Sequence, residues 1–167
     1  MSCLIDAEYV FKGMKCVKLE TEKYLAVVSL ETGGAVLRFY DKANRIEIFR
    51  YREDCTAKKI NEARVLWGLP TLYLANRFDG GVIKTSDGLY RLPINEEDLG
   101  NFLHGWVHNR SHSVEETYAD EHKAVVKTCF CHDACDEMYK YFPLDFKISY
   151  TFTLSDEKGL EQEICFE

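Results

Sequence analysis

The sequence predicts an all-β fold in which antiparallel sheets pack as a sandwich. Residues 146–154 alternate apolar and polar side chains without a break, as expected for a strand with one buried face. Other short apolar runs recur along the chain, separated by turn-forming residues such as Gly, Asp, Asn and Ser. Helical periodicity is weak. Many short strands without helices are typical of packed antiparallel sheets.

The expected strands follow one another at short spacing. Gly33-Gly34, Ser86-Asp87-Gly88 and Asp120-Glu121 each separate two of these strands, which predicts a hairpin at each position. Residues 57–66 could form one short helix or remain irregular. The strands that we expect cover residues 24–30, 35–40, 46–51, 82–85, 89–92, 113–118, 122–132, 146–154 and 160–166.

Length and composition limit the classes of protein. With 167 residues, 46% of them hydrophobic, we expect a single β-sandwich domain over residues 1–167. The net charge of −7 argues against nucleic acid or a membrane as a partner, because both attract positive surfaces. Seven cysteines without a visible signal peptide indicate reduced thiols and a cytoplasmic location. The last expected strand reaches the final residues, which favours the N-terminal part of a longer domain.

Polar and aromatic residues concentrate in the middle third of the chain. Asn76, Arg77, Asn95 and His104 lie there among several aromatic residues. Amide and guanidinium groups suit the hydroxyls of a sugar, because they form paired hydrogen bonds. Considered one at a time, Asn76 and Asn95 could equally be turn residues, and His104 could cap the end of a strand.

The order and spacing of five segments resemble the aldose 1-epimerase (galactose mutarotase) family. The resemblance covers the chain from about residue 20 onward. It implies a galactose mutarotase-like supersandwich, incomplete in this chain, and a role in carbohydrate metabolism. The segments are Pro70, Asn76-Arg77-Phe78, Gly88-Leu89-Tyr90-Arg91-Leu92, Asn101-Phe102-Leu103-His104-Gly105 and Phe142-Pro143-Leu144-Asp145-Phe146.

The resemblance also implies a chemistry that needs neither metal nor cofactor, the interconversion of the α and β anomers of an aldose. A base removes the anomeric hydroxyl proton, an acid protonates the ring oxygen, and the opened sugar closes on its other face. His104 would bind the sugar near its ring oxygen and support that protonation, because imidazole titrates near neutral pH. Arg77, with Asn76 beside it, would anchor the hexose.

Three departures from the family pattern leave the activity open. The second histidine and the glutamate base of the family lie beyond the residues present, so we expect this chain alone to be inactive. His112 stands where many relatives carry Trp, and Trp106 stands where Gly or Phe is frequent, so the preferred sugar is open. The alternative function is a non-catalytic carbohydrate-binding protein. Half a sandwich would expose an edge or an apolar face, so we expect another chain or the missing C-terminal half as a partner.

Two groups of residues, one of histidines and one of cysteines with a histidine, could bind a metal ion. His104, His108 and His112 have the spacing of zinc ligands on one helix face, but Gly105 and the polar residues around them disfavour a helix, so we expect His108 and His112 at the surface or at the rim of the site.

Cys129, Cys131, His132 and Cys135 lack a second pair of cysteines nearby, so free thiols are the simpler interpretation and a structural metal the alternative. Asp79, Asp87 and Asp145 would be the carboxylates of a glycosidase, but each flanks a turn, where Asp is common.

Overall fold

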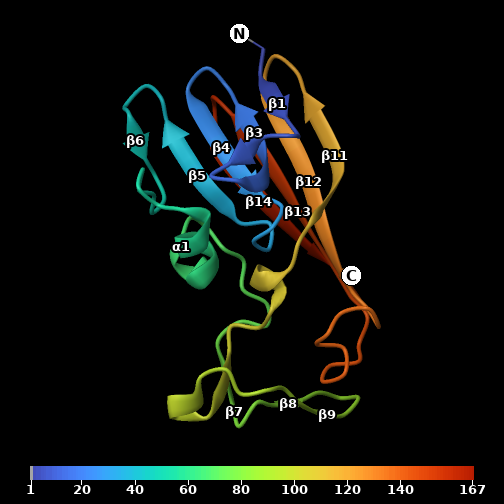
Figure 1. The fold of residues 1–167 in the computed structure, drawn as a ribbon. Coiled ribbons are helices and arrows are strands. Elements are labelled where there is room, and N and C mark those ends of the chain that lie inside the picture. Colours follow the sequence, from blue (N-terminus) through green and yellow to red (C-terminus); the bar gives the residue numbers. More distant parts are fainter. Residues whose placement is uncertain (1) are drawn as a thin grey trace.

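Two antiparallel sheets dominate the computed structural model, which describes residues 2–167 (Figure 1). The first sheet has the order β1-β3-β4-β5-β6, with β2 paired to β3, and the second has the order β11-β12-β13-β14. Their strands are β1 (Leu4–Asp6), β2 (Val10–Phe11), β3 (Met14–Glu20), β4 (Tyr24–Ser29), β5 (Val36–Asp41), β6 (Ile46–Glu47), β11 (Ser113–Ala119), β12 (Lys123–His132), β13 (Phe146–Ser155) and β14 (Gly159–Phe166). The predicted all-β sandwich is confirmed.

The main core lies between the two sheets, where β3 faces β12 and β4 faces β13. The alternation of β13 places one of its faces there, and the apolar side chains of that face are all buried, as predicted. Burying a side chain of this size contributes roughly 1.5–3 kcal/mol. The buried side chains of β13 are Phe146, Ile148, Tyr150, Phe152 and Leu154.

A second, smaller core covers the other face of the first sheet. Helix α1 (Ala57–Glu62) places Ile60 against it, beside Met14 and Val27. Thr56 caps the helix, because its side chain accepts a hydrogen bond from the backbone N–H of Lys59. Of the two alternatives left open for residues 57–66, the structure has the short helix, and the 3₁₀ turn η1 (Arg64–Leu66) follows it.

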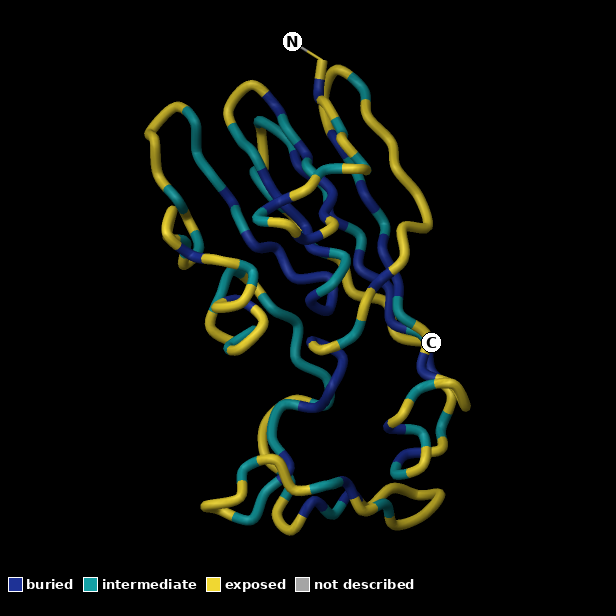
Figure 2. The backbone as a smooth tube through the Cα atoms, viewed as in Figure 1, coloured by how far each residue is buried: buried dark blue, intermediate teal, exposed yellow. Residues whose placement is uncertain are grey.

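The middle of the chain forms a lobe at the end of the sandwich (Figure 1). Two pairs of short antiparallel strands build it, β7 (Arg77–Asp79) with β10 (Asn101–Leu103), and β8 (Val82–Lys84) with β9 (Leu89–Arg91). Two 3₁₀ turns, η2 (Glu97–Leu99) and η3 (Val107–Asn109), flank β10. Figure 2 shows that much of this lobe is exposed, with buried positions where it joins the sandwich.

Two expectations about strands need correction. The strand expected over residues 46–51 has only two residues, β6, because Ile46 and Ile48 are half exposed and the chain leaves the sheet edge after one further backbone bond. The strands before residue 21 were not expected, yet β3 is central to the first sheet. None of the helices formed by residues 2–167 has the length and apolar character needed to span a membrane.

Candidate functional site

The paired strands β7 and β10 bring together the three residues that the sequence singled out. Leu103 lies opposite Arg77 in the register, and the backbone N–H of His104 donates to the carbonyl of Asn76 at 2.9 Å. Asn76 and His104 both adopt left-handed backbone conformations, with φ of +68° and +64°. The expected site residues Asn76, Arg77 and His104 are therefore neighbours at one end of this strand pair.

The side chain of Asn95 fixes the strand that carries His104. Its Oδ1 accepts a hydrogen bond from the backbone N–H of Leu103 at 2.6 Å, and its Nδ2 donates to the carbonyl of Leu103 at 3.0 Å. His104 is half-buried, and its Nδ1 is buried without a hydrogen-bond partner among residues 2–167. A buried polar atom without a partner is costly, so the position of this ring is not explained by hydrogen bonds within the described residues.

Gly105 allows the segment after His104 to pack closely against the chain before β7. Its φ is +66°, and a Cβ at this position would lie 1.9 Å from the carbonyl oxygen of Tyr73. That same oxygen accepts a hydrogen bond from the backbone N–H of Trp106 at 3.2 Å. Only glycine fits this approach, and it sets the direction in which His104 leaves β10.

The indole of Trp106 anchors the segment to the sandwich. It is buried, and its ring centroid lies 5.1 Å from that of His132 and 5.8 Å from that of Phe142. His132 is buried too, and its Nε2 donates to the carbonyl of Phe142 at 2.9 Å. These contacts tie His104 to the loop between β12 and β13.

Arg77 is held by a carboxylate that the sequence did not single out. Its Nε and Nη2 donate to the two oxygens of Glu96 at 2.8–3.0 Å. Asn101 donates to Glu96 as well, at 2.9 Å. Arg77, and then Asn101, hold the pKa of Glu96 below its ordinary value. No sequence signal distinguishes Glu96, because it is the first of three consecutive acids.

The prediction that His108 and His112 lie at the surface or rim was wrong, because both are buried. Gly33 and Gly34 let the backbone pass directly over them: a Cβ on Gly33 would lie 2.4 Å from the Cα of His108, and one on Gly34 would lie 3.0 Å from Nδ1 of His112. Burial lowers the pKa of each imidazole to about 4. Both rings are therefore neutral at pH 7.

No helix carries the three evenly spaced histidines, since η3 spans three residues and β11 begins directly after His112. Of the thiols in the second cluster, Cys129 is buried while Cys131 and Cys135 are exposed. Across residues 2–167, no three His, Cys, Asp or Glu side chains come close enough together to hold a metal ion.

The carboxylates of the glycosidase hypothesis belong to three separate segments. Asp79 lies in β7, Asp87 lies in the β8–β9 turn, and Asp145 precedes β13. All three are exposed, so none has the apolar surroundings of a glycosidase acid.

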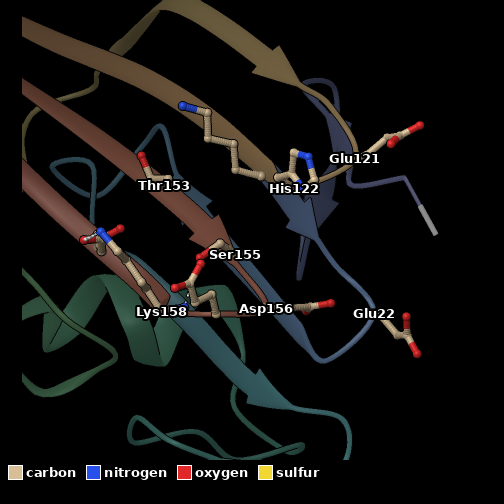
Figure 3. Close-up of a pocket in the computed structure, with 10 residues that line it drawn as sticks. Glu22, Glu121, His122, Thr153, Ser155, Asp156 and Lys158 are labelled. Atoms are coloured by element: carbon tan, nitrogen blue, oxygen red, sulfur yellow. Dashed lines mark hydrogen bonds and ion pairs between the residues drawn. The ribbon is translucent and has the colours of Figure 1, made fainter.

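A hollow of about 670 Å³ (Figure 3) lies at the end of the sandwich away from the lobe that contains β7 and β8 (Figure 1). It is formed where the turns after β3, β11 and β13 meet, and charged side chains dominate it. In Figure 3 Glu22 and Glu121 point outward and away from each other. This hollow contains none of the expected site residues, and we interpret it as a solvated surface between hairpin ends.

The open two-sheet sandwich is the fold of galactose mutarotase-like proteins. The sequence matches the aldose 1-epimerase family profile over residues 15–165. The chain therefore belongs to the aldose 1-epimerase family, and the predicted family is confirmed.

Solved structures agree. A galactose mutarotase-like protein from Clostridium acetobutylicum is 30% identical with a TM-score of 0.90, over 98% of this chain and 48% of that one. A galactose mutarotase-like protein from Lactobacillus casei is 16% identical with a TM-score of 0.62, over 90% and 43%. A putative aldose 1-epimerase from Escherichia coli K12 is 17% identical with a TM-score of 0.59, over 85% and 42%. This chain spans about half the length of these proteins.

Proposed function

We propose that this chain binds an aldose at the cluster of Asn76, Arg77 and His104 and takes part in interconverting its α and β anomers. The observation that carries the proposal is the position of His104. It is half-buried, fixed by its backbone bond to Asn76, and has an unpartnered ring nitrogen. An imidazole held this way can donate a hydrogen bond to the ring oxygen of a sugar and transfer a proton as the ring opens.

Arg77 would anchor the sugar through donors that remain after its pairing with Glu96. Its guanidinium is half exposed and fixed in direction by two carboxylate oxygens. A guanidinium oriented in advance loses less freedom when it binds a hydroxyl, and this favours affinity. The unpaired cysteines of residues 2–167 support a reducing compartment such as the cytoplasm for this activity.

One observation favours a second candidate, a non-catalytic carbohydrate-binding role. Glu96 is near enough to His104 for the imidazole to influence its titration, but Arg77 and Asn101 already occupy its oxygens. A carboxylate whose pKa is lowered in this way is a weak general base. The described residues thus offer an acid in His104 and a binding group in Arg77, with no equally suited base beside them.

Polarimetry separates the two candidates. Freshly dissolved α-D-glucose or α-D-galactose relaxes to its anomeric equilibrium at a measurable rate, and an epimerase increases that rate. Acceleration that disappears in His104→Ala and persists in His122→Ala, a matched loss of an exposed histidine on the β11–β12 turn, would support the epimerase and overturn the expectation that this chain alone is inactive. Sugar binding without acceleration would support the binding role. Absence of sugar binding by NMR would refute both.

A further inference from the structure

A polar groove lies apart from the His104 cluster, on the side of η3 that faces η1. Its volume is about 620 Å³, enough for a monosaccharide, and it is open to solvent on one side. Residues of β3, the turn between β4 and β5, α1, η1, η3 and the segment after η3 line it. It shares no lining residue with Asn76, Arg77 and His104. Its polar lining residues are Lys15, Glu31, Asn61, Arg64, Asn109 and Ser111, and His112 forms its inner wall.

Arg64 is a half-buried guanidinium without a carboxylate partner. Its Nη2 donates to Oδ1 of Asn61 at 2.6 Å, and its Nη1 is 3.5 Å from the carbonyl of His108. Among residues 2–167, no acid lies within ion-pair distance of it. A guanidinium removed from water usually has a carboxylate or phosphate partner, so Arg64 retains donors that a ligand can use.

Glu31 lines the same groove and is also free of any ion pair with residues 2–167. Its Oε1 accepts a hydrogen bond from the backbone N–H of Lys15 at 3.0 Å, which fixes the carboxylate in place. Glu31 and Arg64 therefore share one groove beyond ion-pair distance: burial lowers the pKa of Arg64, and the charge of Glu31 partly opposes that shift.

His112 forms a fixed inner wall of the groove. It is 5% exposed and lines the groove, and its Nε2 has no hydrogen-bond partner among the described residues. The ring is fixed by stacking on Tyr150, with centroids 4.9 Å apart, and by the hydroxyl of Thr128, 3.4 Å from Nδ1.

We infer that this groove is a second binding site, which takes a neutral, hydroxyl-rich molecule of the size of a pyranose. Hydroxyl groups both donate and accept, so one such molecule can accept from Arg64 and donate to Glu31. An anion would satisfy Arg64 but would be repelled by Glu31. A cation would meet Lys15 and Arg64. The proposal concerns a site distinct from the His104 cluster, so either site can fail without the other.

The test is an NMR titration of the full chain with a sugar that cannot change its anomer. Methyl β-D-galactopyranoside and methyl α-D-glucopyranoside serve as probes, added to about 100 mM because small polar sites bind in the millimolar range. The imidazole signals of His112 report on the groove, and those of His104 report on the other cluster. We expect both sets to shift, with the His112 set lost in Arg64→Met and retained in Lys58→Met, which removes an exposed charge from α1.

Ser111→Glu provides a second variant that leaves the core intact, because Ser111 is exposed. The longer, charged side chain should fill the groove and raise the dissociation constant there at least tenfold. Shifts confined to His104 would refute the second site and support the proposed function. Shifts confined to His112 would support the second site and refute sugar binding at the His104 cluster.

The inference also fails if inorganic phosphate, and neither glycoside, shifts His112, or if Arg64→Met and Ser111→Glu bind as the unmodified chain does. If neither histidine responds to either glycoside, both proposals are wrong.

Discussion

Lowering the pH should reduce the free energy of unfolding of this protein before the carboxylates begin to titrate, because two histidines are buried in the neutral form. Burial lowers the pKa of His108 and of His112 from 6.5 to about 4. Arg64, His104 and Arg110 surround His108 with further positive charge, which acts in the same direction. The unfolded chain therefore takes up protons near pH 6.5, before the folded chain does, and stability falls as the pH drops from about 6.5 towards 4.

The size of this effect follows from the two pKa values. Between pH 7 and pH 5, a shift from 6.5 to about 4 corresponds to a loss of about 2 kcal/mol for each histidine. Both together give about 4 kcal/mol, a large share of the stability of a typical domain. Carboxylates contribute little in this range, because their unfolded pKa values lie near 4.

Urea unfolding, followed by tryptophan fluorescence at pH 7.0 and pH 5.0, measures the loss directly. With a slope of about 2 kcal/mol per molar urea, the midpoint should fall by about 2 M. His112→Phe keeps a ring to stack on Tyr150 and removes the proton acceptor, so it should lose only about half as much stability over the same interval. His122→Gln, at an exposed turn, is the control. An unchanged midpoint at pH 5, or a loss in His112→Phe equal to that of the unmodified chain, would refute the reasoning.

Two further substitutions test the support of the His104 site at pH 7, and a third tests the ion pair between Arg110, after η3, and Asp136 in the β12–β13 loop. Gly105→Ala would place Cβ 1.9 Å from the carbonyl oxygen of Tyr73, and we expect a loss of about 2–4 kcal/mol in urea unfolding; a loss below 0.5 kcal/mol would show that the segment adapts freely. Asn95→Ala removes both side-chain bonds to β10 and should cost about 1–2 kcal/mol with faster amide exchange in that strand, whereas unchanged exchange would contradict this role. Arg110→Met removes the guanidinium from the 6% exposed carboxylate of Asp136, which keeps only the backbone N–H of Met138 and the ring of His132 as neighbours. The change should cost about 3–5 kcal/mol, with partial recovery on adding Asp136→Asn; no recovery would refute the ion-pair explanation.

The sequence was most informative where one local pattern decided the structure. The alternation of β13 and the turn residues around Gly88 and Gly34 depend on the chain within a few positions, and each was predicted correctly. The expected hairpin around Asp120 was also found. Strand β3 was missed because its charged residues interrupt the alternation of apolar and polar side chains. Lys18 forms an ion pair with Glu20 at 3.1 Å, and Glu20 forms another with Lys42, after β5, at 2.9 Å. These ion pairs stabilise the charged side chains of β3, and the one with Lys42 cannot be seen in the local sequence.

The burial of His108 and His112 was not predicted, because it depends on contacts with residues far away in the sequence. His108 and His112 stand next to Asn109 and Ser111, polar neighbours that indicate a surface. Their burial depends on the Gly33-Gly34 turn, which lies about seventy-five residues earlier in the chain and packs over them. The partner of Arg77 was hidden for the same reason, because only the β7–β10 pairing brings Glu96 beside it.

The backbone at His104 is itself an argument that the residue serves more than the turn. Asn76 and His104 both have positive φ, a region that asparagine and histidine adopt more often than most residues but that only glycine enters without a Cβ clash. Glycine at position 104 would allow the same turn into Gly105 more cheaply. The fold nevertheless holds His104 there through Asn76, Asn95 and the close approach of Gly105 to Tyr73. Strain that several independent contacts maintain, on a side chain with an unpartnered buried nitrogen, is the expected property of a binding residue.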